Sequence, residues 1–87
     1  MGYNENLLRR AIEDAEAENG WDITYRQVGE QQIGYNHNLY QYEVIVDGQW
    51  AEDEAEDFFR NYDFYGVYTE ETDHSYAVLN IEIDSAY

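Results

Sequence analysis

The fold is decided by residues 39–62, which read LYQYEVIVDGQWAEDEAEDFFRNY and contain a strand, a turn and a helix in succession. Residues 39–46 are rich in aromatic and β-branched side chains, which favour a strand. Asp47-Gly48 then supplies turn chemistry. Residues 50–62 are predicted to form an amphipathic helix, because their apolar side chains fall on one stripe at helical spacing. That stripe consists of Ala51, Ala55, Phe58, Phe59 and Tyr62.

Similar patterns on either side supply the remaining elements. Residues 4–19 predict a first helix, with apolar side chains at i, i+3, i+4 and i+7 and Gly20 at its C-terminal end. Residues 21–28 alternate between apolar and polar side chains and predict a strand. The polar residues 29–38 predict a long hairpin loop. Two further strands are expected at residues 64–69 and 75–83, separated by a charged turn at residues 70–74.

The predicted order is therefore αββαββ, an α+β fold in a single acidic domain over residues 1–87. Strands joined by hairpins pair with each other, and each amphipathic helix needs an apolar surface to cover. We expect a four-stranded antiparallel sheet with both helices packed on one face. The chain has no Cys, so this fold holds without disulfides.

The charge of the chain restricts its partners. Twenty Asp and Glu stand against four Arg and no Lys, which gives a formal net charge of −16 over 87 residues. Nucleic-acid binding draws its affinity from Lys and Arg on phosphates, so direct binding of DNA or RNA is excluded. Anionic membrane surfaces are excluded by the same argument. The partner that this charge predicts is a basic protein.

The densest run of acid lies in the second predicted helix. Five carboxylates in six residues give roughly one negative charge per 1.8 Å of helix axis, close to the value of about 1.7 Å for duplex DNA. Helical geometry places Glu56 with Asp53 and Asp57 opposite the apolar stripe, and such crowding is expected to raise carboxylate pKa values. We therefore predict that this run contacts a partner: Glu52, Asp53, Glu54, Glu56 and Asp57.

A second group of candidate contact residues lies near the third predicted strand. Exposed Tyr beside carboxylates is typical of protein interfaces, where Tyr is enriched at the positions that contribute most affinity. The predicted group consists of Glu70, Glu71, Asp73, Tyr65 and Tyr68.

The sequence predicts no enzyme, with no catalytic residues, no metal site and no cofactor. His37 and His74 have no metal-ligand spacing, and without Cys a structural zinc site is not expected. The segment Asn61-x-Asp63-x-Tyr65-Gly66 begins like a calcium-binding loop, but Thr72 stands where the bidentate Glu should be. No phosphate-binding glycine loop or nucleophile elbow is present.

In size, charge and lack of Cys, together with the acidic run of residues 52–57, the chain resembles the small acidic anti-CRISPR and other DNA-mimic proteins of phages. The resemblance rests on no sequence motif. It implies a viral inhibitor that blocks the nucleic-acid groove of a basic host protein, with a Cas effector as the leading candidate, in the cytoplasm of the host cell. The alternatives are an immunity protein or antitoxin that neutralises a cognate nuclease, and a halophilic housekeeping domain. The sequence leaves open whether the protein is a monomer or a homodimer.

Overall fold

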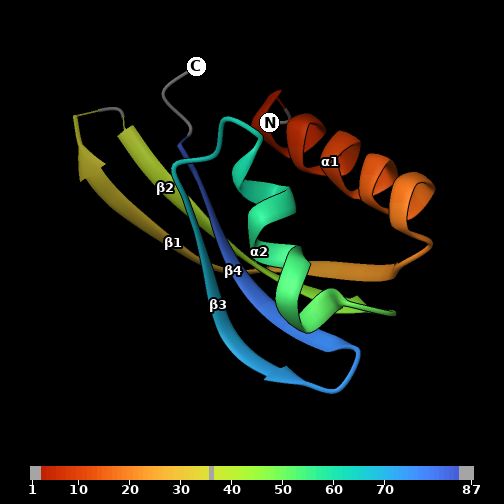
Figure 1. Cartoon of the computed structure of the whole chain (residues 1–87). Coiled ribbons are helices and arrows are strands. Elements are labelled where there is room, and N and C mark those ends of the chain that lie inside the picture. Colours follow the sequence, from red (N-terminus) through yellow and green to blue (C-terminus); the bar gives the residue numbers. More distant parts are fainter. Residues whose placement is uncertain (1–2, 36, 85–87) are drawn as a thin grey trace.

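The computed structural model describes residues 3–35 and 37–84, and they form two helices and one four-stranded antiparallel sheet (Figure 1). This confirms the predicted αββαββ order. The elements are α1 (Tyr3–Asn19), β1 (Asp22–Gly34), β2 (His37–Asp47), α2 (Ala51–Arg60), β3 (Gly66–Asp73) and β4 (Tyr76–Asp84). Neither helix of the described chain has the length and hydrophobicity that crossing a membrane requires.

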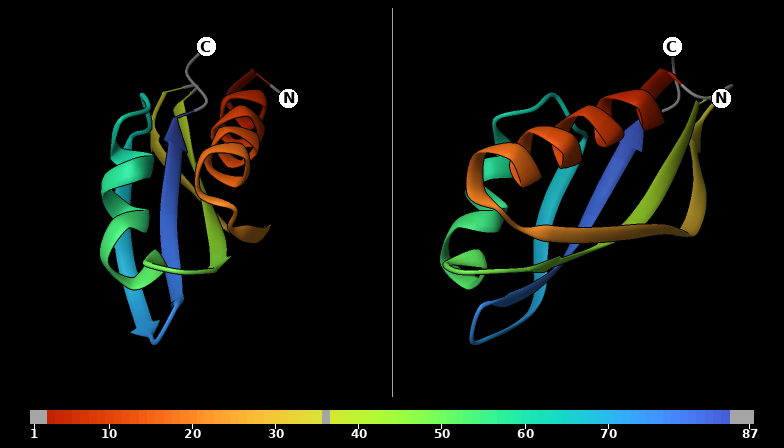
Figure 2. Two further views of the ribbon diagram at one scale, coloured as in Figure 1. Left: turned by 45° about the vertical axis from the view of Figure 1, so that its right-hand side comes forward. Right: turned by 90° about the vertical axis from the view of Figure 1, so that its right-hand side faces the viewer.

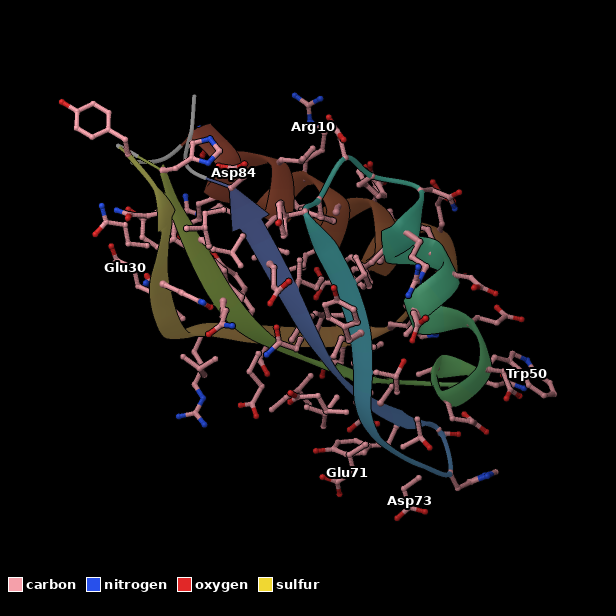
Figure 3. The ribbon with its side chains drawn as sticks, turned by 90° about the vertical axis from the view of Figure 1, so that its left-hand side faces the viewer. Arg10, Glu30, Trp50, Glu71, Asp73 and Asp84 are labelled. Atoms are coloured by element: carbon pink, nitrogen blue, oxygen red, sulfur yellow. The ribbon has the colours of Figure 1, made fainter. Side chains whose placement is uncertain are left out.

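The sheet has the strand order β1-β2-β4-β3, so β2 and β4 are central and β1 and β3 are the two edges. Both helices cover the same face, as predicted (Figure 2), and the other face is free of helices (Figure 3). Alternate residues of the central strands face the helices and are fully buried, including Val44, Val46, Leu79 and Ile81. These side chains form the core with the apolar stripes of α1 and α2.

The apolar stripe of α1 is buried as its spacing predicts, with Leu8, Ala11 and Ala15 fully covered. The helix ends at Asn19, and the following Gly20 has φ 70°, a left-handed conformation that favours glycine. The backbone amide of Gly20 donates to the carbonyl of Glu16 at 2.9 Å. Such a C-terminal turn supplies a partner for a carbonyl that the helix itself leaves free.

Two predicted loops are instead parts of strands. Residues 29–34 continue β1 as far as Gly34, and residues 70–73 belong to β3. Both segments pair along a central strand, β1 with β2 and β3 with β4. The ladder of a neighbouring strand therefore overrides the low strand propensity of Gly, Gln and Glu. Each edge strand accommodates its irregular residues by a change of register, between Gln27 and Gly29 in β1 and between Thr69 and Glu71 in β3.

Trp21 connects the start of β1 to the turn before α2. Its side chain is buried, and its indole nitrogen Nε1 donates to the carbonyl of Gln49 at 2.8 Å. A Cβ atom at Gly48 would lie 2.5 Å from Cδ1 of Trp21, so only glycine fits there without a shift of the indole. The indole also packs edge-on against Phe58, with ring centroids 6.0 Å apart. These contacts fix the position of α2 on the sheet.

Candidate protein-binding surface

The N-terminal end of α2 concentrates negative charge where a helix tolerates it. Glu52, Asp53 and Glu54 occupy the first turn, where carboxylates interact favourably with the helix dipole. Trp50 precedes the helix in a left-handed conformation with φ 71°, and its side chain makes no capping hydrogen bond. The carbonyl of Trp50 accepts the backbone amides of Asp53 and Glu54 at 3.1 and 2.9 Å. The dipole thus offsets part of the repulsion within this turn.

Two of the five α2 carboxylates bind to the edge of the sheet. Glu56 accepts the backbone amide of Thr69 at 3.1 Å and also the Thr69 hydroxyl. One turn earlier, Oε1 of Glu52 accepts the backbone amide of Ser75 at 3.0 Å, in the turn between β3 and β4. These bonds hold α2 against β3, and they place Glu56 on the side of the helix that faces the strand. The predicted position opposite the apolar stripe is therefore wrong for Glu56.

Arg60 completes this row of contacts along β3. Its Nε donates to Glu56 at 2.8 Å, and its Nη2 donates to the carbonyl of Val67 at 2.9 Å. Hydrogen bonds from Thr69 and Arg60 hold the pKa of Glu56 below its ordinary value. The expectation that crowding raises the pKa of the acidic residues is therefore wrong for Glu56.

The other three acidic residues of α2 are exposed to solvent: Asp53, Glu54 and Asp57. Asp53 and Asp57 are spaced i, i+4, a like-charge arrangement that destabilises an isolated helix by a few tenths of a kcal/mol. Their repulsion is not relieved by Arg60, whose guanidinium bonds to Glu56 and to the backbone of β3.

The acidic residues of β3 lie beside this helix, on the adjacent edge strand. Glu70, Glu71 and Asp73 are all exposed. Glu70 accepts the side-chain amide of Asn80 at 3.4 Å. Figure 3 shows Glu71 and Asp73 near the turn that joins β3 to β4. Glu71 and Asp73 pair with Val78 and Tyr76, which alternate with the core residues of β4, so both point to the helix-free face of the sheet. The two predicted groups therefore lie on adjacent elements, α2 and β3, at one margin of the sheet, and we call their exposed carboxylates the acidic edge. It consists of Asp53, Glu54, Asp57, Glu70, Glu71 and Asp73.

Tyr65 and Tyr68 lie at the other end of β3 and are exposed, with relative accessibilities of 57% and 49%. Tyr68 lies across Gly66, where an added Cβ would be 2.7 Å from the ring and 2.8 Å from Oε1 of Glu82. Gly66 therefore leaves room for the Tyr68 ring on the helix-free face of the sheet. The backbone amide of Tyr65 donates to the carbonyl of Glu82 at 2.9 Å. Both aromatic rings thus project from an anchored backbone next to the acidic edge.

One aromatic residue of this surface was not identified from the sequence. The Trp50 side chain is 55% exposed at the start of α2, directly before the acidic first turn. The prediction of a helix over residues 50–62 included Trp50 as a helical residue. The signal that was available is that Trp50 lies off the apolar stripe of Ala51, Ala55 and Phe59.

The helix-free face of the sheet also carries carboxylates that were not predicted from the sequence as contact residues. Glu43 forms an ion pair with Arg26 at 3.0 Å, and Glu82 accepts the side-chain amide of Gln41 at 3.3 Å. The alternation of Asn80, Glu82 and Asp84 with buried residues in β4 was the signal for this face. Each of these contacts joins neighbouring strands, so we assign them to sheet stability.

The described residues of α2 and β3 offer exposed negative charge and aromatic surface. Among the described residues, no group of three or more His, Asp or Glu side chains is placed to hold a metal ion. His37 lies 3.5 Å from Asp84, at the end of the sheet away from α2. Comparison of the chain with protein-family models, with curated proteins and with solved structures finds no match.

Proposed function

We propose that the protein is a non-enzymatic inhibitor that presents its acidic edge to the nucleic-acid groove of a basic protein. The observation that carries this proposal is the juxtaposition of two rows of exposed carboxylates, one on α2 and one on the edge strand β3. A groove that binds phosphates is lined by Lys and Arg. Carboxylates on a rigid surface can pair with the same side chains, so the inhibitor and the nucleic acid compete for them.

The electrostatics of α2 and β3 favour such a partner. Arg60 is the single basic residue of these two elements, and its charge is directed to Glu56 and the Val67 carbonyl. The six carboxylates of the acidic edge therefore lack a cation of their own element. Opposite fields accelerate encounter with a basic partner, and this acceleration falls as salt screens the charges.

Three exposed aromatic side chains next to the acidic edge supply the apolar part of the interface. Trp50 precedes the acidic turn of α2, Tyr65 directly precedes β3, and Tyr68 lies on β3 with Glu70. Trp and Tyr are the residue types most enriched among those that dominate binding energy. Charge alone would give a fast but weak complex, whereas aromatic anchors slow dissociation.

A CRISPR–Cas effector is the first target to test, because small acidic anti-CRISPR proteins have the size and charge of this chain. The assay is competition between the purified protein and DNA for the effector, read as the inhibitor concentration that displaces half of the labelled DNA. Displacement is expected to weaken as salt is raised. The triple variant Asp53→Lys, Glu54→Lys, Asp57→Lys is expected to lose at least tenfold in potency, about 1.4 kcal/mol or more.

The matched control makes the same change in net charge elsewhere on the molecule. Glu13, Glu18 and Asp22 are exposed residues of α1 and β1, and the triple change of these residues to Lys leaves the acidic edge intact. We expect the potency of this control in displacing DNA to fall by less than about threefold, since interactions between charges are screened beyond about 10 Å at 0.1 M salt. Equal loss in the two triple variants would refute a role for the acidic edge, and no displacement by the wild type from any basic nuclease would refute the function.

A further inference from the structure

The distal segment of β1, residues 27–34, forms a free edge of the sheet. β1 pairs with β2 on one side, and no strand formed by residues 3–35 or 37–84 lies on its other side. Seven of the eight residues of this segment are exposed. Figure 1 shows this part of β1 extending away from both helices, and Figure 3 shows Glu30 at the margin of the sheet opposite to Trp50 and α2.

Elsewhere on the two sheet edges, side chains of the helices occupy individual backbone groups. On β3, Glu56 binds the amide of Thr69 and Arg60 binds the carbonyl of Val67. On the proximal part of β1, the Glu16 carboxylate accepts the backbone amide of Ile23 at 3.2 Å. Side chains on exposed backbone groups are one way in which proteins prevent pairing of edge strands. In the distal segment of β1, the side-chain amides of Gln27 and Gln32 donate to the carbonyls of Gly29 and Gly34 at 3.5 and 3.3 Å. No hydrogen bond from either helix reaches the backbone of this segment among the described residues.

The distal segment also lies in the part of the chain that is electrically neutral. Residues 24–42 contain one Arg, one Glu and no other Asp, Glu or Lys, so the net charge of −16 is carried by the rest of the sequence. Three of the eight residues in the distal segment are Gln. A basic partner has no electrostatic reason to bind here, whereas a second copy of this acidic chain avoids repulsion best at this place.

Apolar side chains at the ends of the segment add to the surface that a partner could cover. Val28 is 47% exposed, Ile33 is 37% exposed, and Tyr35 in the following turn is 92% exposed. Val28 and Ile33 lie at the two register shifts of β1, so the regular ladder between them covers residues 29–32. The segment therefore combines a short regular strand with an apolar residue at each end.

We propose that the distal segment of β1 pairs antiparallel with the same segment of a second copy, forming a homodimer with one continuous sheet of eight strands. Two-fold symmetry about Glu30 would oppose two carboxylates. Symmetry about Gln31 instead places Gln31 opposite Gln31 of the other copy and Glu30 opposite Gln32. In this arrangement the acidic edges lie at the two far ends of the shared sheet, where they remain accessible.

The experiment is sedimentation equilibrium of the wild-type chain at protein concentrations from about 10 μM to about 1 mM, the range expected for a small interface. The mass should rise from 10.3 kDa towards twice that value. Association should strengthen between about 50 mM and 500 mM salt, because salt screens the repulsion between two acidic chains. Binding to a basic partner weakens with salt, so the two kinds of association are distinguishable. A mass of 10.3 kDa under all these conditions would overturn the proposal.

Variants locate the interface. Gln31→Glu should raise the dimer dissociation constant about three- to fivefold at low salt, because it opposes two carboxylates across the strands. Gln49→Glu, the same change in an exposed turn residue, should leave that constant within twofold. Because the chain has no Cys, oxidation of Gln31→Cys should yield a cross-linked dimer, and Glu71→Cys on the other edge should not. Equal effects of the two Gln→Glu changes, or equal cross-linking of the two Cys variants, would overturn the proposal.

Discussion

Removal of the Glu56 carboxylate should loosen the contact between α2 and β3. Glu56→Ala deletes hydrogen bonds from the Thr69 amide, the Thr69 hydroxyl and Arg60. The Glu56 side chain is 33% exposed, so the gain from these bonds is reduced by solvent screening. Because this screening reduces what each hydrogen bond contributes, we expect Glu56→Ala to lose about 1 to 2 kcal/mol in the free energy of unfolding at pH 7. Each kcal/mol corresponds to a fall in Tm of about 4 to 8 °C for a domain of this size.

The pH dependence separates this contribution from a general loss of helix stability. Because hydrogen bonds lower the folded-state pKa of Glu56, its stabilisation is present above the unfolded-state pKa, ordinarily about 4.5. That stabilisation is lost as the pH falls through the folded-state pKa, so wild type and Glu56→Ala should converge in strongly acidic buffer. Urea unfolding at pH 7 and in acid measures the difference in the free energy of unfolding between wild type and Glu56→Ala at each pH.

Asp57→Ala is the control, because Asp57 is exposed and removing it also relieves the repulsion with Asp53. It should leave stability within about 0.5 kcal/mol of wild type at both pH values. The reasoning is refuted if Asp57→Ala costs as much as Glu56→Ala, or if the Glu56→Ala deficit persists unchanged in acid.

Two further changes test other contacts. The Tyr62 hydroxyl donates to Asp14 at 2.6 Å, and burial together with this bond raises the pKa of Tyr62 to about 12. Absorbance titration should therefore show a tyrosine that ionises well above the ordinary value of 10. Because the folded-state pKa is raised, the stabilisation from this hydroxyl is lost as the pH rises towards 12. Tyr62→Phe should remove this transition and lower the free energy of unfolding by about 1 kcal/mol at pH 7. Gly48→Ala should lower the free energy of unfolding in urea by more than about 2 kcal/mol, because its Cβ would meet the Trp21 indole. Gly20→Ala should lower it by only about 1 kcal/mol, because a Cβ at Gly20 meets nothing within 4 Å. A larger loss for Gly20→Ala than for Gly48→Ala would contradict the packing described for Trp21.

The helices and the sheet class were predictable because they depend on local periodicity. Ala51, Ala55 and Phe59 recur at helical spacing and are buried. The lengths of β1 and β3 were not predictable in the same way. Residues 29–34 and 70–73 have poor intrinsic strand propensity and form strands because β2 and β4 supply hydrogen-bonding partners across the sheet.

The candidate surface was predictable only in part, for a related reason. The sequence alone shows that α2 and β3 are acidic, but the bonds of Glu56 to Thr69 and of Glu52 to Ser75 join residues 13 and 23 positions apart. Helical geometry cannot tell which carboxylates face a strand that lies next to the helix only in the folded chain. The exposure of Trp50 depends in the same way on the left-handed residue conformation that begins α2.

The unequal burial of the two tryptophans gives the protein two intrinsic fluorophores with separate tasks. Trp21 is 4% exposed in the core, and Trp50 is 55% exposed beside the acidic turn of α2. Emission from Trp21 should shift to longer wavelength only when the domain unfolds, whereas acrylamide should quench mainly Trp50 in the native state. The Trp50→Phe variant keeps Trp21 and reports folding, whereas the Trp21→Phe variant keeps Trp50 and reports docking of a partner. Complex formation and denaturation can therefore be followed separately by fluorescence without any attached dye.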